Sequence, residues 1–144
     1  MSLTLIFELG DEVYGLEVSA VQEILADPQR HFVPQAGGPM ASAINFHGQV
    51  LPLIDLPLLL GYDQPDRDYR KIVLTPEYHS LVFDVSSVQQ IRRLDLTAQR
   101  PAPADSGTRA IRGVVNSGEM PVNLLDTEQI ILLLHNLYAR HEGL

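Results

Sequence analysis

Short apolar runs separated by turn-forming residues occupy most of this 144-residue chain, and they constrain its fold more than any other feature. The first run, Thr4–Leu9, lies in a stretch with apolar side chains at every second position, at Leu3, Leu5, Phe7 and Leu9. A period of two is typical of a β-strand with one buried face. Gly10-Asp11 then separates this run from a second one, Val13–Val18, so the two runs predict a β-hairpin.

The same pattern predicts three more hairpins and two single strands. The hairpins are Ala43–Phe46 with Val50–Asp55, Arg70–Thr75 with Ser80–Val85, and Ala110–Asn116 with Met120–Leu125. The single strands lie near His31–Val33 and Ile91–Leu94. Together these segments predict a mainly β fold.

Helices are predicted at two places. Ser19-Ala20-Val21-Gln22 has the pattern of a capping box, which predicts a short helical turn that runs to about Leu25. Asp126, with Gln129 three positions later, predicts the start of a final helix of about fourteen residues. The apolar run Ile130–Leu134 in that helix is more typical of a buried helix than of a partner-binding one, although both interpretations remain open.

Two of the predicted hairpins resemble each other. The segments Asn45–Asp55 and Asn116–Asp126 have the same length, and each contains a glycine turn, a proline and two apolar residues before the final Asp. Two copies of such a unit are too few for a solenoid. They predict two related β lobes within a single domain that spans residues 1–144.

Charge and composition exclude several kinds of partner. The chain carries 10 Lys and Arg against 18 Asp and Glu, a net charge of −8, which repels nucleic acid and anionic lipid surfaces. Its apolar runs are much shorter than the roughly 20 residues of a membrane-spanning helix, so no direct membrane insertion is expected. It has no cysteine, which excludes disulfides and thiol catalysis and agrees with a cytoplasmic location.

No arrangement typical of catalysis, of cofactor binding or of a metal site is found. The sequence has no nucleophile elbow, P-loop or dinucleotide fingerprint, and its five histidines are scattered. Asp105-Ser106-Gly107 matches the short motif of aspartic proteases, but it occurs once, in a proline-rich loop, and is better explained as a turn. The chain is therefore predicted to be a binding module without enzyme activity or cofactor. The alternative hypothesis is a small hydrolase or metal enzyme that uses Asp55, Asp126 or the histidines.

The stretch Phe7–Val18, followed by Val21-Gln22-Glu23-Ile24, resembles the opening signature of the CheW-like family. The resemblance continues at Ile44–Gly48, Val50–Leu56, Val85–Ile91, Arg100–Pro103, Ile111–Val114 and Leu124–Asp126. It implies two small five-stranded β barrels with a C-terminal helix and short helical turns. It also implies a signalling scaffold without an active site.

Members of this family bridge the cytoplasmic tips of chemoreceptors to the regulatory domain of a chemotaxis histidine kinase, so the resemblance implies these two partners. It also implies a groove between the lobes that receives the receptor's helical hairpin. The expected partner-binding residues are Val21, Glu23, Ile24, Ile44, Asn45, Phe46, His47 and Gly48. At least some of the four apolar members should be exposed, as is usual at interaction sites. A detached regulatory domain of the kinase is an alternative with the same fold.

Three positions depart from the family pattern. His47 replaces an Arg of the Asn-x-Arg-Gly motif, Ser42 replaces a Gly, and Ser86 stands in place of the Asp of Val-Asp-x-Val, for which Asp84 could substitute. An imidazole lacks the permanent charge and the five donors of a guanidinium. The change at His47 therefore predicts an atypical partner, with loss of binding by drift as the alternative.

Overall fold

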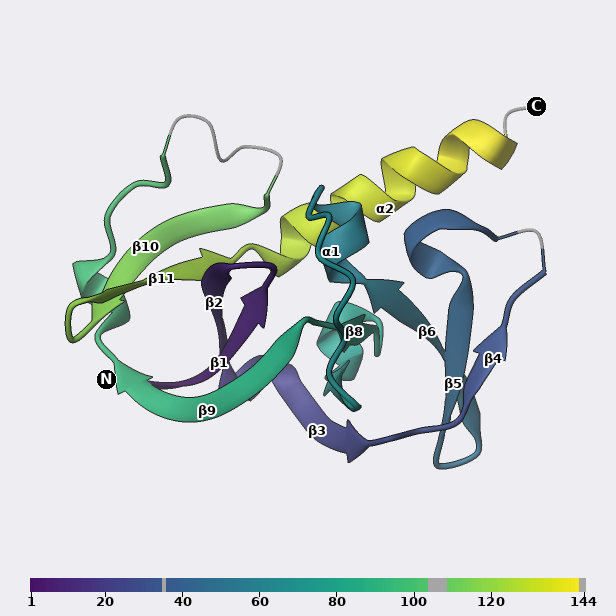
Figure 1. Ribbon diagram of the computed structural model, residues 1–144, viewed down its shortest axis with the longest axis horizontal. Coiled ribbons are helices and arrows are strands. Elements are labelled where there is room, and N and C mark those ends of the chain that lie inside the picture. The colour runs from purple at the N-terminus through teal and green to yellow at the C-terminus, as the bar shows by residue number, and fades with distance from the viewer. Residues whose placement is uncertain (35, 104–108, 143–144) are drawn as a thin grey trace.

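The computed structural model describes residues 1–34, 36–103 and 109–142, in which the strands form two sheets. Sheet A has the order β10-β11-β2-β1-β9, and sheet B has the order β3-β7-β8-β6-β5-β4. Figure 1 shows sheet A on the left and sheet B on the right, with the last helix running from the end of β11 at the centre over the top of sheet B. The predicted mainly β fold with a C-terminal helix is confirmed, but only sheet A has the five strands expected of each lobe, because the short strand β4 adds a sixth to sheet B.

The strands of sheet A come from both ends of the described chain, and sheet B lies between them in sequence. Sheet A contains β1 (Ser2–Leu9), β2 (Glu12–Glu17), β9 (Ser87–Leu94), β10 (Ile111–Ser117) and β11 (Met120–Leu125). Sheet B contains β3 (Val21–Ala26), β4 (Arg30–Phe32), β5 (Ser42–Phe46), β6 (Gln49–Asp55), β7 (Arg70–Leu74) and β8 (Val82–Asp84). The helices are α1 (Leu56–Leu59) and α2 (Thr127–Glu142), and the 3-10 turns are η1 (Val18–Ala20), η2 (Gly38–Met40), η3 (Pro76–Tyr78) and η4 (Leu96–Ala98).

All four predicted hairpins are present, but the helical turn predicted from Ser19 to Leu25 is wrong. Only the 3-10 turn η1 forms there, without a side-chain cap, and Val21–Ala26 continues as strand β3. This strand pairs antiparallel with β7 through registers such as Ile24↔Ile72. The ladder with β7 satisfies the backbone groups that a short helix would have left partly unpaired, so tertiary pairing overrides the local capping pattern.

The two similar hairpins occupy equivalent places in the two sheets. Asn45 pairs with Val50 in the β5–β6 hairpin, and Asn116 pairs with Pro121 in the β10–β11 hairpin. The second strand of each hairpin pairs in parallel with another strand, β6 with β8 and β11 with β2. The Asp that follows each hairpin caps a helix: Asp55 accepts from the N–H of Leu58 (3.3 Å), and Asp126 accepts from the N–H of Gln129 (3.0 Å). The residues that the two segments share, from the Asn to the final Asp, thus have the same structural roles in both sheets.

Alternating side chains divide the interior into three apolar clusters. In β1, Leu5 and Phe7 join a shared core between the sheets, whereas Ile6 joins a separate core of sheet A. In β7, Ile72 joins the shared core and Val73 joins a separate core of sheet B. Each sheet therefore encloses its own interior and also contributes one apolar face to the contact with the other sheet.

Helix α2 joins the two sheets. It begins directly after β11 of sheet A, and Ile130 and Leu134 are buried in the shared core. Near its other end, the hydroxyl of Tyr138 donates to the carbonyl of Gly37 (2.7 Å) and accepts from the N–H of Met40 (2.9 Å), next to sheet B. The prediction of a buried helix holds for this face, but Leu132 is half exposed on the outer face.

A tyrosine pair adds a polar contact between the sheets. The hydroxyl of Tyr14, on β2, lies 2.9 Å from the hydroxyl of Tyr62, in the segment after α1, and donates to the carbonyl of Arg109 (3.0 Å). Burial, followed by the hydrogen bond with Tyr62, raises the pKa of Tyr14. The phenol therefore stays protonated at neutral pH and acts as a neutral link between the sheets.

Candidate functional site

Two of the predicted partner-binding residues lie on the face of β3 that borders the shared core. Val21 pairs with Leu74 and Ile24 pairs with Ile72, and both of these β7 residues are buried in the shared core. Because paired residues of a ladder point to the same face, Val21 and Ile24 face the junction of the sheets. Val21 is half-buried against the shared core, and Ile24 is 36% exposed.

Sheet A supplies two exposed apolar residues on its own side of this junction, and sequence reasoning missed both of them as site residues. Ile91 pairs with Leu5 of the shared core and is 53% exposed, and Leu3 lies two positions from Leu5 and is 46% exposed. Leu3 and Val18 also line a hollow of about 320 Å³. The alternation of Leu3 with Leu5 and Phe7 was the signal that could have found this face. We call Leu3, Val21, Ile24 and Ile91 the interlobe surface.

Glu23 points to the opposite face of β3. It pairs with Val73, whose side chain lies in the core of sheet B, and its carboxylate reaches His47 at 3.5 Å between Oε1 and Nε2. Both side chains are exposed to solvent. An exposed ion pair of this kind contributes at most about 1 kcal/mol, so these two groups are available to a partner at little cost to folding.

The β5–β6 turn presents His47 in a defined backbone conformation. His47 has a φ of 50° and Gly48 a φ of 84°, as expected of a two-residue hairpin turn. The side chain of Asn45 closes this turn by accepting from the N–H of Gly48 (3.1 Å). The ring of Phe46 lies edge-on to the imidazole of His47, with 4.3 Å between the ring centroids. His47 is thus held at the tip of the hairpin.

Ile44 does not belong to the surface, and its prediction as a partner-binding residue is wrong. Its side chain is 0% exposed and lies in the core of sheet B, because the face of β5 that it shares with Phe46 is covered by the other strands of that sheet. Phe46 packs against the same core and is half-buried. Of the four apolar residues predicted here, Ile24 alone is classed as exposed, which confirms that part of the set is accessible.

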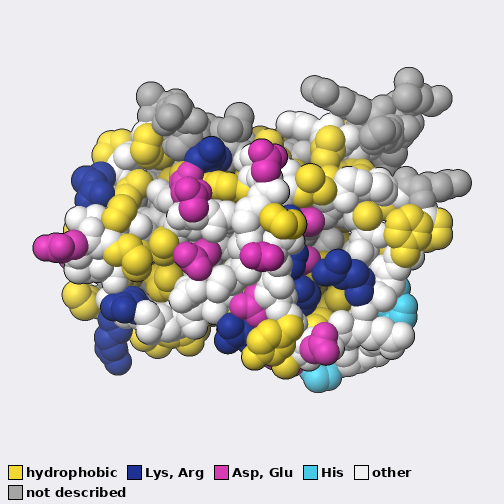
Figure 2. All heavy atoms as spheres, viewed as in Figure 1, with side chains coloured by type: hydrophobic (Ala, Val, Ile, Leu, Met, Phe, Trp, Pro, Cys, Tyr) yellow, Lys and Arg dark blue, Asp and Glu magenta, His cyan; other side chains and the backbone are white. Residues whose placement is uncertain are grey.

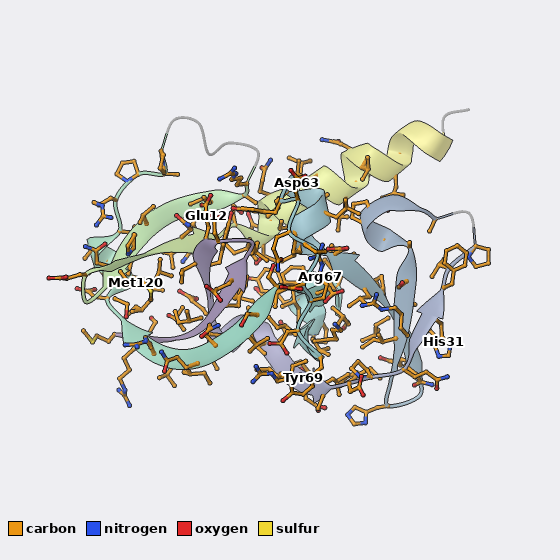
Figure 3. The ribbon with its side chains drawn as sticks, viewed as in Figure 1. Glu12, His31, Asp63, Arg67, Tyr69 and Met120 are labelled. Atoms are coloured by element: carbon orange, nitrogen blue, oxygen red, sulfur yellow. The ribbon has the colours of Figure 1, made fainter. Side chains whose placement is uncertain are left out.

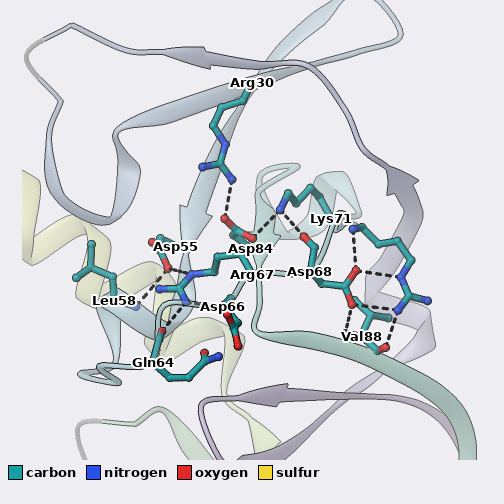
Figure 4. A network of polar contacts seen from close by, with 11 residues as sticks. Arg30, Asp55, Leu58, Gln64, Asp66, Arg67, Asp68, Lys71, Asp84 and Val88 are labelled. Atoms are coloured by element: carbon teal, nitrogen blue, oxygen red, sulfur yellow. Dashed lines mark hydrogen bonds and ion pairs between the residues drawn. The ribbon is translucent and has the colours of Figure 1, made fainter.

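The positions around the Val-Asp-x-Val departure have structural contacts. The hydroxyl oxygen of Ser86 accepts from the N–H of Gly10 (2.9 Å) and thereby holds the β1–β2 turn. Asp84 is buried within sheet B, where Lys71 and Arg30 each approach it at 2.8 Å, as Figure 4 shows. Asp84 is therefore part of an internal ion network and is not exposed to a partner.

The same network continues to Asp68. This carboxylate accepts from the guanidinium of Arg70 and from the N–H of Val88 (2.7 Å). Val88 lies on β9, a strand of sheet A. Burial acts to raise the pKa of Asp68, but the hydrogen bonds from Arg70 and from the backbone of Arg70 and Val88 outweigh it, so the pKa lies below its usual range. Asp68 is therefore ionised at neutral pH and ties the connection between the sheets in place.

The residues of the enzyme hypothesis are not brought together. Asp55 and Asp126 cap different helices, and Asp55 also pairs with Arg67 (2.9 Å), which Figure 3 labels near the centre of the molecule. His31, also labelled there, lies at the outer strand β4. In residues 1–34, 36–103 and 109–142, no group of three His, Cys, Asp or Glu could hold a metal ion. The motif Asp105-Ser106-Gly107 lies outside the described residues.

Two curled sheets, a shared core and exposed apolar residues at their junction define a β-sheet adaptor module, a class of protein that acts by binding. The chain belongs to the CheW-like domain family, whose model, described as the CheW-like domain, matches residues 3–134. It is therefore a non-enzymatic scaffold, as the sequence predicted, and the hydrolase or metal-enzyme alternative is set aside.

Known proteins agree with this family. The chain is 28% identical over 132 residues to the chemotaxis protein CheW of Klebsiella aerogenes, covering 88% of this chain and 80% of that protein. It is 25% identical over 129 residues to a probable chemotaxis protein CheW of Rhizobium etli, covering 86% and 83%. The crystal structure of the scaffolding protein TtCheW from Thermoanaerobacter tengcongensis superposes with a TM-score of 0.77 at 21% identity, covering 85% of this chain and 87% of that one.

Proposed function

We propose that this chain couples chemoreceptors to a chemotaxis-type histidine kinase in the cytoplasm, and that the interlobe surface binds the helical tip of the receptor. The observation that carries the proposal is the apolar face of the shared core, which continues to the surface at Leu3, Ile24 and Ile91 from two different sheets. An apolar helix face packed between such walls would bury surface that is now in contact with water. In the described part of the chain, no helix is long and apolar enough to cross a membrane.

Glu23 and the turn residues Asn45, His47 and Gly48 lie on the other side of β3 from Ile24, and we propose that they form a polar edge beside the apolar contact. The carboxylate of Glu23 and the imidazole of His47 are both exposed beside the strand that carries Ile24. Charged groups at the rim of an interface set partner choice and association rate more than affinity. We therefore assign His47 a role in partner selection.

A detached kinase regulatory domain with the same fold is the second candidate. The adaptor is favoured because the curated relatives are named CheW and the chain covers 80% of the first and 83% of the second. We also propose that residues 1–144 form one domain of two pseudo-repeated lobes, supported by the equivalent hairpins and helix caps in the two sheets.

Charged substitutions test the interlobe surface. Ile24→Glu and Ile91→Glu should each weaken binding to a receptor-tip fragment at least about tenfold, because a carboxylate would be desolvated against an apolar helix face. Leu132→Glu is the matched control, since Leu132 is 50% exposed on the outer face of α2. Binding is measured by titration calorimetry, and circular dichroism checks folding. Equal affinity for all three variants would refute the proposed site.

The role of His47 is tested by restoring the guanidinium. His47→Arg should increase affinity for a receptor tip from a pathway whose adaptor carries the family's Arg, because the guanidinium adds a permanent charge and more donors. His31→Arg, on the exposed strand β4, is the control for the added charge. If both variants bind with unchanged affinity, drift at His47 is the simpler explanation.

A further inference from the structure

Three arginines differ from the other basic side chains that the structure describes. The others each form an ion pair with an Asp or Glu; they are Arg30, Arg67, Arg70, Lys71, Arg109 and Arg112. Arg92, Arg93 and Arg100 are exposed and have no carboxylate partner among the described residues. This is unexpected in a chain with 18 acidic and 10 basic residues, where a nearby carboxylate should be easy to find.

These three arginines line one hollow of about 500 Å³ at the end of sheet A. Arg92 and Arg93 come from β9, and Arg100 lies after η4 beside β10. Figure 2 shows dark blue side chains at the left edge of the molecule, the end occupied by sheet A in Figure 1. Their polar neighbours are neutral amides: Arg92 lies beside the side-chain amide of Gln90, and Arg100 donates to Asn116 (3.1 Å). Most of their donors therefore remain available.

Two acidic groups offset part of this positive charge. Asp95 lines the hollow, but its carboxylate already accepts from the N–H (3.1 Å) and the hydroxyl (2.6 Å) of Thr97. Hydrogen bonds from the hydroxyl and the backbone of Thr97 lower the pKa of Asp95. The carboxylate of Asp95 is therefore charged at neutral pH, and Thr97 already uses part of its hydrogen-bonding capacity. Glu119 lies in the turn of the β10–β11 hairpin, next to Gly118 of the hollow. Three guanidinium groups still exceed two carboxylates.

We propose that this hollow is a docking site for an acidic segment of a partner protein. Guanidinium groups bind carboxylates through paired, charge-assisted hydrogen bonds, and the three that line this hollow have no carboxylate partner among the described residues. A short acidic segment interacts mainly within a Debye length of about 10 Å, whereas an extended polyanion or an anionic membrane would also meet the net charge of −8. Arg93 pairs with Leu3, so the hollow borders the interlobe surface, but the proposal does not depend on the function assigned to that surface.

An NMR titration with a synthetic glutamate-rich peptide tests the proposal. The guanidinium signals of Arg92, Arg93 and Arg100 should shift in a saturable way, and the affinity should fall as salt is added. Arg93→Gln should weaken binding by about two- to fivefold, the effect of one exposed ion pair. Arg112→Gln is the matched control, because it removes one charge from the same sheet at a residue already paired with Glu17.

Further arms separate the competing explanations. Arg92→Gln and Arg100→Gln repeat the measurement in case Arg93→Gln perturbs folding, and Arg93→Glu should bind a lysine-rich peptide better than the wild type does. Inorganic phosphate should bind more weakly than the peptide. The proposal is overturned if phosphate binds as tightly as the peptide, if Arg112→Gln loses as much affinity as the hollow variants, or if the three arginines show no shift.

Discussion

At the scale of single residues, burial decides whether a charged group serves the fold or is available for binding. Asp84 is buried between Lys71, also buried, and the half-exposed Arg30. Glu23 makes its one described ion pair with His47 at the surface. The first arrangement leaves no charge for a partner, whereas the second leaves two groups accessible. In the sequence, Asp84 and Glu23 are simply two acidic residues. The sequence does not show that one is buried in the fold and the other is available to a partner.

Asp84→Asn should lower the free energy of unfolding by about 3 kcal/mol, because it leaves the buried ammonium of Lys71 without its charged partner. Arg30→Gln is the control: Asp84 would keep Lys71, and the half-exposed guanidinium should contribute at most about 1 kcal/mol. Urea unfolding of both variants measures the difference. Equal losses would show that Lys71 gains little from Asp84.

The depressed pKa of Asp68 predicts an acid-sensitive contribution to stability. Because the folded pKa lies below the unfolded one, the contribution is complete above the unfolded pKa and is lost as pH falls through the folded value. In Asp68→Asn, the free energy of unfolding should fall less between neutral and acidic pH than in the wild type. Urea unfolding across that pH range is the measurement, and parallel pH profiles would contradict the prediction.

At the scale of elements, a capping Asp links each similar hairpin to a helix. Asp126→Ala should lower the free energy of unfolding by about 1 kcal/mol, because the N–H of Gln129 loses its acceptor at the start of α2. Asp126→Asn, which keeps an acceptor oxygen, should remain close to the wild type. Thermal unfolding of the two variants provides the test. A loss of the same size in Asp126→Asn would mean that the charge matters more than the cap.

The elements also show where local sequence reasoning succeeds and where it fails. The β5–β6 and β10–β11 hairpins were predictable because alternation, glycine turns and a terminal Asp are all local signals. Strand β3 was not, because Val21–Ala26 carries a capping pattern at its start and becomes a strand by pairing with β7, far along the chain. The short helix α1 was missed as well, although Asp55 and Pro57 mark its start.

At the scale of the whole molecule, the shared core contains residues from both sheets and from the last helix. It includes Leu5 and Phe7 of sheet A, Ile72 and Phe83 of sheet B, and Ile130 of α2. We therefore expect a single cooperative unfolding transition, in which the slowest-exchanging amides of β1 and β7 report the same opening free energy. Hydrogen exchange followed by NMR measures both. Two separate transitions would argue for two independent domains.

The sequence alone determined the β class, the hairpins, the final helix and the family resemblance, because each depends on the order of side chains within a short stretch. It also supplied Glu23, Ile24 and His47 as surface residues of the candidate site. The burial of Ile44 and the contribution of Leu3 and Ile91 depended on the tertiary structure, since exposure is set by strands that pair from distant parts of the chain. The tertiary structure also decided that three arginines lack a carboxylate partner within the described part of the chain, because ion pairing depends on which side chains the two sheets bring within reach of one another.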